Sequence, residues 1–422
     1  MRPAPLLELC AALLQSVLKL DQPADRVVSA FFREHRLLGP RERHTLAETA
    51  YAVLRQRLAL QHLAQSGQGA LPRRLAILAW QGDAAFLRAA LTPAEQAWRD
   101  QVAALDRSQL PERLRHNLPQ WAADPLRAEL GEEGFWALVQ ALDTSAPLDL
   151  RVNVLKTRRE DAQAALQALG VTSAPTPYSP WGLRLVGKPS LTRLAPFEAG
   201  EVEVQDEGSQ LLALLTGARR GEMVVDFCAG AGGKTLAIGA MMRSTGRLYA
   251  LDTSGHRLAA LKPRLARSGL SNVHPVQIAH ERDDRVRRLA GKADRVLVDA
   301  PCSGLGTLRR NPDLKWRQSP ETVQALQAQQ QAILEAAAKL VRPGGRLVYA
   351  TCSLLRAESE DVAAAFTAAH GREFEPLAAS ELLAAAGVAD GQGLQGADGA
   401  LRLWPHRHHT DGFYAMAWAR RA

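Results

Sequence analysis

From about residue 206 to residue 422, short apolar runs alternate with segments of helical pattern, and this alternation constrains the fold more than any other feature. The runs are MVVDF, RLYALD, VHPVQIA, RVLVDAP and RLVYATC, followed by a closing GFYAMAWARR. Strands that alternate with helices form a mostly parallel sheet, because each parallel strand needs a crossover connection. We therefore predict an α/β, Rossmann-like doubly wound domain over residues 206–422.

Two regions of different pattern precede this domain. Residues 1–140 place apolar side chains at helical spacing, as in LLELCAALLQSVLKL, and show no strand alternation. Between residues 145 and 205, PLDLRVNVLK, WGLRLVG and EVEVQ predict strands, and REDAQAALQALG predicts a helix. We expect an all-helical N-terminal domain and then a small α+β domain.

Charge and cysteine content narrow the class of protein. The 422 residues carry a formal net charge of +8, which favours a polyanionic partner such as nucleic acid. Arginine outnumbers lysine by 44 to 8, so a genomic preference for arginine is the alternative explanation. Cys10, Cys228, Cys302 and Cys352 are too few and too scattered for a disulfide framework, which predicts reduced thiols in a cytoplasmic protein. We expect no membrane span and no signal peptide.

The stretch DFCAGAGGKT, after the first apolar run, predicts a ligand-binding turn. Its Gly-Lys-Thr ending resembles a phosphate-binding loop, but Cys228 stands where that loop requires glycine. The dinucleotide fingerprint also fails, because its last glycine would have to stand at Thr235. A strand ending in Asp226, a tight turn and a helix start remain, which suit a cofactor of the adenosine-methionine type. Asp252 ends the second strand and either reaches the ribose hydroxyls or caps the next helix.

Two cysteines follow neighbouring apolar runs. Asp299 and Cys302 come just after the fourth predicted strand, and Cys352 comes just after the fifth. Since ligands of such sheets bind outside the carboxyl ends of the strands, we expect all three side chains near the cofactor. A lone cysteine is most often a small buried hydrophobe, but two in this position predict chemistry.

Two thiols and a carboxyl group beside a methyl donor provide the groups needed to methylate carbon 5 of cytosine. A thiolate that adds to carbon 6 of the ring turns carbon 5 into a nucleophile that can take a methyl group. A carboxyl group near ring nitrogen 3 would balance the charge that develops during the addition. A base must then remove the proton from carbon 5 so that the thiol can leave.

These motifs resemble the RNA 5-methylcytosine methyltransferases of the RsmB (Fmu/Sun) type, in the RsmB/NOP family. DFCAGAGGKT is similar to the family's cofactor loop, DAPCSGLGTLRRNPDLKW to its first cysteine motif and YATCS to its second. EVEVQDEGSQLL and LRLWPHRHHTDGFYAM also fit the pattern, so the resemblance extends from about residue 145 to the end. It implies S-adenosyl-L-methionine as cofactor, RNA as partner and a methyltransferase domain over residues 206–422.

The resemblance also implies residue roles. Cys352 would be the nucleophile, Cys302 would assist product release, and Asp299 would contact the cytosine. DNA cytosine methyltransferases instead use the cysteine of a Pro-Cys motif, which would make Cys302 the nucleophile; the TCS motif favours the RNA arrangement. The cofactor would be held by Asp252, Asp299 and the loop of Cys228, Ala229, Gly230, Ala231, Gly232, Gly233 and Lys234.

The chain departs from the family pattern at several places. Gly230-Ala231 stands where most members have Ala-Pro. The aspartate that usually meets the adenine is not evident in VQIAHERDD, where Asp283 or Glu281 could substitute. The helices of residues 1–140 would correspond to a NusB-like, RNA-binding domain.

Four further stretches have competing interpretations. RVNVLK and RRNPDLKW combine basic groups with an aromatic and suit RNA contacts; a solvated basic surface is the alternative. HRHH has no partner ligands at metal spacing, so we predict no metal site, and QDEGSQ predicts a helix start. The side chains concerned in the first two stretches are Arg151, Asn153, Lys156, Arg309, Arg310, Lys315 and Trp316.

The sequence therefore predicts an S-adenosylmethionine-dependent RNA (cytosine-5)-methyltransferase, acting on small-subunit (16S) ribosomal RNA as a monomer. A tRNA cytosine-5 methyltransferase is one alternative. A non-catalytic RNA-binding assembly factor and a phosphate-loop nucleotide hydrolase are the others. The first of these two would not need the cysteines, and the missing glycine at Cys228 disfavours the second.

Overall fold

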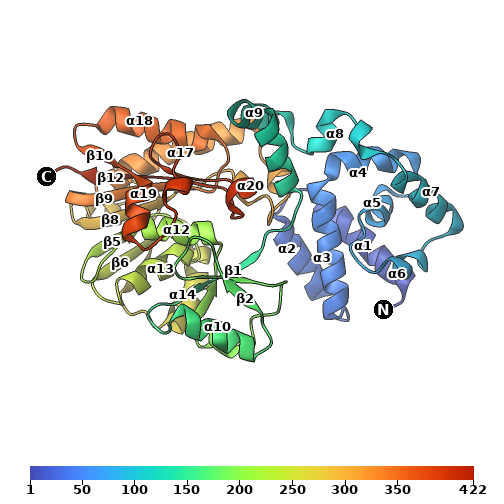
Figure 1. Cartoon of the computed structure of the whole chain (residues 1–422), viewed down its shortest axis with the longest axis horizontal. Coiled ribbons are helices and arrows are strands. Elements are labelled where there is room, and N and C mark those ends of the chain that lie inside the picture. The colour runs from blue at the N-terminus through green and yellow to red at the C-terminus, as the bar shows by residue number, and fades with distance from the viewer. The chain divides into compact units, whose positions relative to one another are not determined.

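The computed structural model describes residues 1–422 (Figure 1). The chain forms two compact units, each of which is described separately. The first comprises residues 1–145 and 307–320, and the second comprises residues 146–306 and 321–422. No helix combines the length and apolarity needed to cross a membrane.

The first unit contains only helices, as predicted for the N-terminal region. Its core is built from apolar side chains of α1, α2, α3 and α5, which recur at helical spacing and are buried together. The longest element, α9, is two helical stretches joined at Gly131, whose φ is +69°. The helices are α1 (Pro3–Val17), α2 (Ala24–Glu34), α3 (Pro40–Arg55), α4 (Arg57–Leu63), α5 (Leu71–Ala79), α6 (Ala84–Arg88), α7 (Pro93–Ala103), α8 (Glu112–His116), α9 (Gln120–Leu142) and α16 (Leu314–Arg317).

Residues 307–320 complete this helical unit. The amino group of Lys315 donates to the carbonyl of Arg55 at 2.7 Å, and the indole N–H of Trp316 donates to the carbonyl of Leu54 at 2.7 Å. Lys315 is 5% exposed, and Trp316 packs against the helical core. The prediction that these two side chains contact RNA is therefore wrong: they are packing groups of the first unit.

Arg309 is buried in the same unit, which also argues against a role at an RNA surface. In RVNVLK, Arg151 is buried and donates to Gln205 at 2.6 Å, and Asn153 is buried between two backbone carbonyls. The amino group of Lys156 donates to two more carbonyls. The RNA interpretation is wrong for Arg151 and Asn153 because their polar groups are used inside the fold. For the exposed Lys156 and for Arg310 it stays a prediction.

The second unit contains a small antiparallel sheet of order β2-β3-β1-β4. Its apolar face is covered by α10, whose Ala162 and Leu166 pack against Leu150 and Leu183. The predicted small α+β region is therefore present. Its elements are β1 (Leu148–Val152), α10 (Arg159–Ala168), β2 (Ser173–Pro175), β3 (Gly182–Leu185), α11 (Ala195–Glu198) and β4 (Val202–Val204).

The large sheet has the strand order β10-β12-β9-β8-β5-β6-β7, with β11 paired to β12. The pairs β5–β6, β6–β7, β5–β8 and β8–β9 are parallel, whereas β12 pairs antiparallel with β9. The predicted doubly wound sheet is confirmed. Its strands are β5 (Met223–Asp226), β6 (Arg247–Asp252), β7 (Val273–Gln277), β8 (Ala293–Asp299), β9 (Val341–Thr351), β10 (Phe374–Leu377), β11 (Leu401–Leu403) and β12 (Phe413–Arg420).

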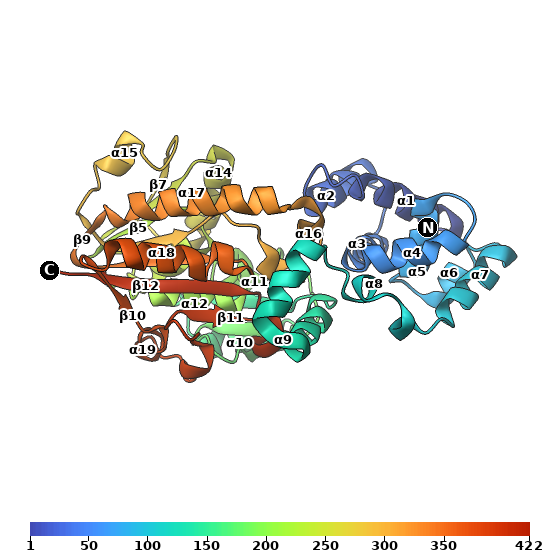
Figure 2. The ribbon, with the colours of Figure 1, turned by 90° about the horizontal axis from the view of Figure 1, so that it is seen from above.

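Helices cover both faces of this sheet, because successive side chains of a strand point to opposite faces. Val224 packs with α12, α13 and α19, while its neighbour Val225 packs with α17 and α18. Figure 2 shows α17 and α18 running along one face of the sheet. The helices are α12 (Glu207–Leu215), α13 (Gly233–Met241), α14 (Gly255–Ser268), α15 (Asp284–Arg287), α17 (Pro320–Ala338), α18 (Glu360–His370), α19 (Ala379–Ala385) and α20 (Pro405–His408).

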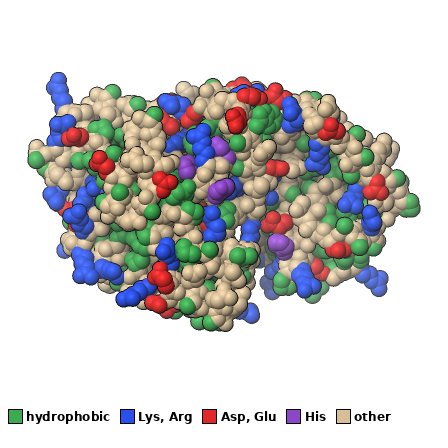
Figure 3. All heavy atoms as spheres, in the orientation of Figure 1, with side chains coloured by type: hydrophobic (Ala, Val, Ile, Leu, Met, Phe, Trp, Pro, Cys, Tyr) green, Lys and Arg blue, Asp and Glu red, His purple; other side chains and the backbone are tan.

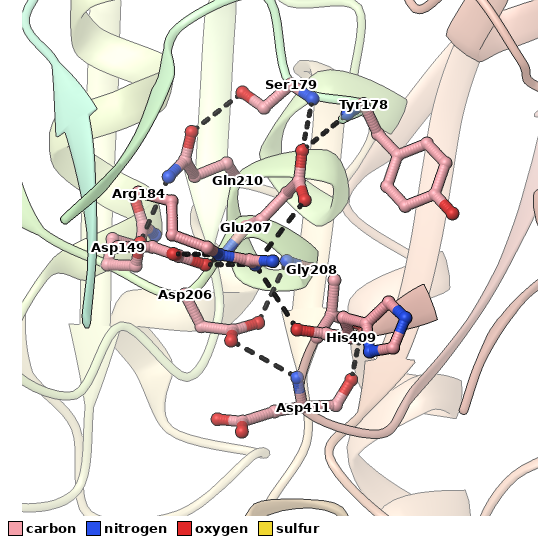
Figure 4. Close-up of polar contacts among 12 residues, drawn as sticks. Asp149, Tyr178, Ser179, Arg184, Asp206, Glu207, Gly208, Gln210, His409 and Asp411 are labelled. Atoms are coloured by element: carbon pink, nitrogen blue, oxygen red, sulfur yellow. Dashed lines mark hydrogen bonds and ion pairs between the residues drawn. The ribbon is translucent and has the colours of Figure 1, made fainter. Parts of the chain in front are cut away.

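A buried polar network joins the small sheet to the start of α12 (Figure 4). Arg184 of β3 donates to both oxygens of Asp149 of β1, at 2.8 and 2.9 Å. Glu207 accepts from the backbone N–H groups of Tyr178 and Ser179, at 2.6 and 2.7 Å. These partners make the burial of each carboxylate tolerable and join the small sheet to α12, which packs on the large sheet.

The stretch QDEGSQ begins a helix, as predicted. Asp206 is the N-cap of α12, and its carboxylate accepts from the N–H of Gly208 at 2.9 Å. In HRHH, the ring of His408 accepts from the N–H of Trp404 at 2.8 Å. No group of three or more His, Cys, Asp or Glu side chains that could hold a metal ion occurs in the structure.

The buried Lys315 gives a prediction about stability. Burial lowers its pKa from 10.5 to about 7, so between these values the unfolded chain holds a proton that the folded chain has lost. Stability should therefore rise as the pH increases from about 7 to about 10. Lys315→Met should remove this rise and stabilise the first unit by a few kcal/mol (roughly) near pH 7.

Thermal unfolding of both proteins across this pH range measures the effect. Parallel curves for wild type and Lys315→Met would contradict it. RNA affinity should be the same in both, because the ammonium group lies inside the fold.

Candidate active site

A cavity of about 690 Å³ opens at the carboxyl ends of the parallel strands. This volume lies within the range of about 300–1,000 Å³ that is usual for cofactor sites. It is lined by segments at or just after the ends of five strands: the turn after β5, Asp252 of β6, residues 278–281 after β7, residues 299–302 at the end of β8, and Cys352 after β9. The sheet therefore gathers segments far apart in the chain around one ligand site.

Two glycines shape the turn after β5. Gly230 and Gly232 adopt φ values of +56° and +82°, which side chains with a Cβ rarely tolerate. A Cβ on Gly232 would lie 2.2 Å from Leu261 of α14, so this position needs glycine for packing as well. Every residue of the predicted cofactor loop lines the cavity except Gly232, which forms the N-cap of α13.

Asp252 fastens this turn. Its carboxylate accepts from the N–H of Gly230 at 2.8 Å and from the N–H of Ser254 at 2.7 Å. The cap of α14 is Ser254 itself, whose hydroxyl accepts from Arg257. Asp252 thus lines the cavity and orders the turn, and helix capping is left to its neighbour.

The two acidic candidates after β7 have different positions. Glu281 lines the cavity. Asp283 instead caps α15, accepting from the N–H groups of Ala279 and Arg285, both at 2.8 Å. Glu281 is therefore the side chain that can meet a ligand.

Asp226 is a cavity residue that the sequence motif left without a role. It is 1% exposed, and one carboxylate oxygen accepts from the Thr235 hydroxyl at 2.6 Å. The other oxygen is buried without a hydrogen-bond partner. Burial raises its pKa to about 7, against the Thr235 bond and with a further contribution from the nearby Asp299.

The two predicted cysteines meet at the cavity, where their sulfur atoms are 3.3 Å apart. The hydrogen bond with Cys352 raises the pKa of Cys302 well above its usual value, and burial raises it further. Cys302 is therefore held as a thiol that can donate to the sulfur of Cys352. Burial also raises the pKa of the Cys228 thiol, which leaves that group inert.

Lys234 and Asp299 form an ion pair of 2.6 Å beside these thiols. Burial disfavours the charged ammonium, but the carboxylate of Asp299 outweighs it and the pKa of Lys234 is raised. Lys234 was predicted to hold the cofactor; its amino group is directed instead at Asp299, the side chain predicted to meet the cytosine.

Comparison with known proteins agrees with this geometry. The model of the 16S rRNA methyltransferase RsmB/F family matches residues 213–419, and the ferredoxin-like domain of RsmF/B-like methyltransferases matches residues 118–192. A probable ribosomal RNA small subunit methyltransferase B of Synechocystis is 36% identical over 74% of this chain and 68% of its own length. The chain belongs to the RsmB/F methyltransferase family.

Further relatives of this RsmB/F member are a probable small subunit methyltransferase B of Bacillus subtilis and a putative methyltransferase of Mycobacterium tuberculosis. They are 34% and 39% identical, over 64% and 72% of this chain. The alignments span 59% and 64% of these two relatives, less than two thirds of their length.

Solved structures share the fold. The crystal structure of PH0851 has a TM-score of 0.79 at 23% identity and covers 99% of both chains. A methyltransferase homolog from Pyrococcus horikoshii has a TM-score of 0.62 at 27% identity, over 75% of this chain and all of its own. The predicted Rossmann-like methyltransferase fold is thereby confirmed.

S-adenosylmethionine is the cofactor of this RsmB/F protein, and it supplies an electrophilic methyl group. The cavity fits it: the ligand carries sulfonium and ammonium charges, and the wall presents the carboxylates of Asp226, Asp252 and Glu281. The unpartnered oxygen of Asp226 is an acceptor available to such a cation. The backbone turn after β5 would hold the rest of the molecule.

Sequence reasoning missed several cavity residues because no motif marks them. Ser209 comes from α12, whose opening looked only like a helix start. Gln329 and Ile333 lie one turn apart on α17, within a stretch rich in Gln and Ala where no position is distinctive. Only the spacing of one helical turn could have paired these two side chains.

Asp226 gives a prediction about pH. Between pH 4 and 7 the unfolded chain has lost the proton that the folded chain keeps on this carboxyl group, so stability should fall as the pH rises through this window. Asp226→Asn should remove the fall and be more stable by a few kcal/mol (roughly) above pH 7.

The amide can still accept from Thr235, which preserves the local contact. Urea unfolding at a series of pH values, without cofactor, measures the difference. A wild-type fall that persists in Asp226→Asn would show that another group titrates.

Proposed function

We propose that this protein is an S-adenosylmethionine-dependent (cytosine-5)-methyltransferase of 16S ribosomal RNA that acts through a covalent cysteine adduct. The observation that carries the proposal is the pair of thiols 3.3 Å apart beside the Lys234–Asp299 ion pair, at the mouth of the cofactor cavity. The descriptions of the family and of its relatives support ribosomal RNA as substrate.

The raised pKa of Cys302 supports the assignment of Cys352 as nucleophile. Only a thiolate adds readily to carbon 6 of cytosine, and Cys302 is held protonated by its bond to Cys352. Cys302 can in turn stabilise negative charge on the sulfur of Cys352. The reverse assignment would require a thiol with a strongly raised pKa to attack.

The remaining groups divide the other tasks. Asp299 would meet ring nitrogen 3 as Cys352 adds to carbon 6, and Lys234 holds that carboxylate in place. Carbon 5 then takes the methyl group. A base must then take the carbon 5 proton. The electron pair of that C–H bond restores the double bond between carbons 5 and 6, the pair of the carbon–sulfur bond returns to Cys352, and the thiol of Cys302 donates a hydrogen bond to the released sulfur.

The helical unit supports a role in binding RNA, as proposed for residues 1–140. Arg33, Arg36 and Arg43 of α2, its following loop and α3 surround Phe32 in a hollow, with Arg43 5.8 Å from the ring centre. Such a set suits phosphate contacts beside a stacked base. Lys and Arg side chains also lie on the surface of the second unit (Figure 3). We infer a cytoplasmic monomer, in keeping with four free thiols.

The cysteine assignment gives a direct test. Cys352→Ala should reduce methyl transfer to background, whereas Cys302→Ala should accumulate a covalent RNA–protein adduct because release is impaired. Cys10→Ala, in the core of the first unit, serves as the control and should keep its activity.

The assay uses labelled S-adenosylmethionine with 16S rRNA, tRNA and an RNA without cytosine, and mass spectrometry locates the methyl group. Adduct formation through Cys302 would reverse the roles. Transfer to tRNA alone would show that tRNA, and not 16S rRNA, is the substrate. No transfer to any RNA would refute the enzyme assignment.

We also infer that Glu281 contacts the adenosine part of the cofactor. Glu281→Gln should weaken S-adenosylmethionine binding by about tenfold, as expected when a charged hydrogen-bond partner is lost. Asp283→Ala should leave the affinity unchanged and destabilise α15, because it removes a helix cap.

Titration calorimetry of both variants compares the two carboxylates under the same conditions. Equal losses of affinity in the two variants would contradict the distinction drawn from the cavity wall.

A further inference from the structure

A fully buried carboxylate lies just behind the two thiols, outside the cavity wall. Glu358 is 0% exposed and belongs to a short 3₁₀ turn, Arg356–Glu358, between β9 and α18. It follows Cys352 by six residues and touches no ligand site. A carboxylate kept in such a place needs partners that repay its loss of water.

Those partners are the residues that immediately follow the two cysteines. One oxygen of Glu358 accepts from the N–H of Ser303 at 2.8 Å. The other accepts from the hydroxyls of Ser303 and Ser353, each at 2.5 Å. A single side chain thus ties the loop of Cys302 to the loop of Cys352.

Glu358 is itself held from two sides. Gln330 of α17 donates to the carboxylate at 3.1 Å and to the carbonyl of Pro301, just before Cys302, at 2.9 Å. The hydroxyl of Tyr349 on β9 donates to the backbone carbonyl of Glu358 at 2.6 Å. The carboxylate is therefore anchored to the sheet and to a helix, so it can act as a fixed point for both loops.

We propose that Glu358 is a positioning residue: its carboxylate fixes the loops of Cys302 and Cys352 at the separation at which one thiol hydrogen-bonds the sulfur of the other. The proposal rests on the proposed function, because it concerns the two cysteines of that reaction. In this proposal, Glu358 holds the two thiols in the arrangement that is needed both for attack by Cys352 and for its later release.

The charge of Glu358 has a second effect. The pKa of Cys302 is raised first by the hydrogen bond with Cys352, then by burial, and also by the negative charges of Cys352 and Glu358. Glu358 therefore helps to keep Cys302 as the hydrogen-bond donor. Reach and charge can be separated by substitution: Glu358→Gln keeps the length and removes the charge, and Glu358→Asp keeps the charge and shortens the reach.

Glu207 provides a matched control in the same unit. It is also 0% exposed and accepts from two backbone N–H groups, but these belong to Tyr178 and Ser179 (Figure 4). Glu207→Gln should lose stability comparable to that lost by Glu358→Gln. Thermal unfolding confirms that each variant is folded before its chemistry is compared.

The first experiment needs no RNA. Limiting iodoacetamide modifies the thiols across a pH series, and mass spectrometry reports the ratio of Cys352 to Cys302 alkylation. In Glu358→Gln this ratio should fall several-fold near pH 8, because removal of the carboxylate charge lowers the pKa of Cys302 and so gives more Cys302 thiolate. A ratio unchanged from wild type, or changed equally in Glu207→Gln, would overturn the proposal.

The second experiment measures single-turnover methyl transfer to 16S rRNA. Both Glu358 variants should be slower by about 100-fold, the usual effect of a small misplacement of reacting groups, with unchanged affinity for S-adenosylmethionine. Glu207→Gln should stay near the wild-type rate. A wild-type rate in Glu358→Gln overturns the positioning role. If the wild type itself transfers no methyl group, the proposed function fails, and the alkylation ratio still decides whether Glu358 positions the thiols.

Discussion

The meeting of the two cysteines with the glycine turn depends on the hydrogen bonds of β8, which pairs in parallel with β5 on one side and with β9 on the other. Parallel neighbours end at the same edge of a sheet, so the glycine turn, the Asp299–Cys302 segment and Cys352 have no choice but to converge. The register brings Asp299 level with Ala350, two residues before Cys352. The strand pairing thus brings two thiols 50 residues apart in the chain to the same edge of the sheet, where their sulfur atoms are 3.3 Å apart.

The cavity concentrates negative charge. This charge suits a cationic ligand, but in the free protein the carboxylates repel one another. Asp226 is buried with one unpartnered oxygen, and Lys234 is the cation that answers Asp299. A ligand with positive charge would relieve the repulsion among these carboxylates. Binding of a positively charged ligand should therefore stabilise the folded protein, because it reduces this repulsion.

Much of the fold could be predicted from the sequence, because it depends on the spacing of apolar residues and on which residues stand at the ends of apolar runs. Apolar runs with acidic or thiol residues at their ends predicted the parallel strands and the meeting of Cys302 with Cys352. The burial of Lys315 could not be predicted, because the sequence around a basic side chain does not show whether that side chain contacts RNA or a buried carbonyl. The choice between Glu281 and Asp283 depended on the backbone turn after β7, which no spacing rule specifies.

Residues 307–320 have a consequence for how the chain is made. They leave the second unit after the Cys302 loop and complete the core of the first, so the two units are interleaved along the sequence. During synthesis the helical unit therefore lacks part of its packing until residue 320 has emerged, after the four strands β5 to β8 of the large sheet have been made. The first unit therefore cannot be completed until most of the second has been made. A cut between residues 145 and 146 would leave the N-terminal piece without residues 307–320 and would leave those residues, in the other piece, without the core that they pack against.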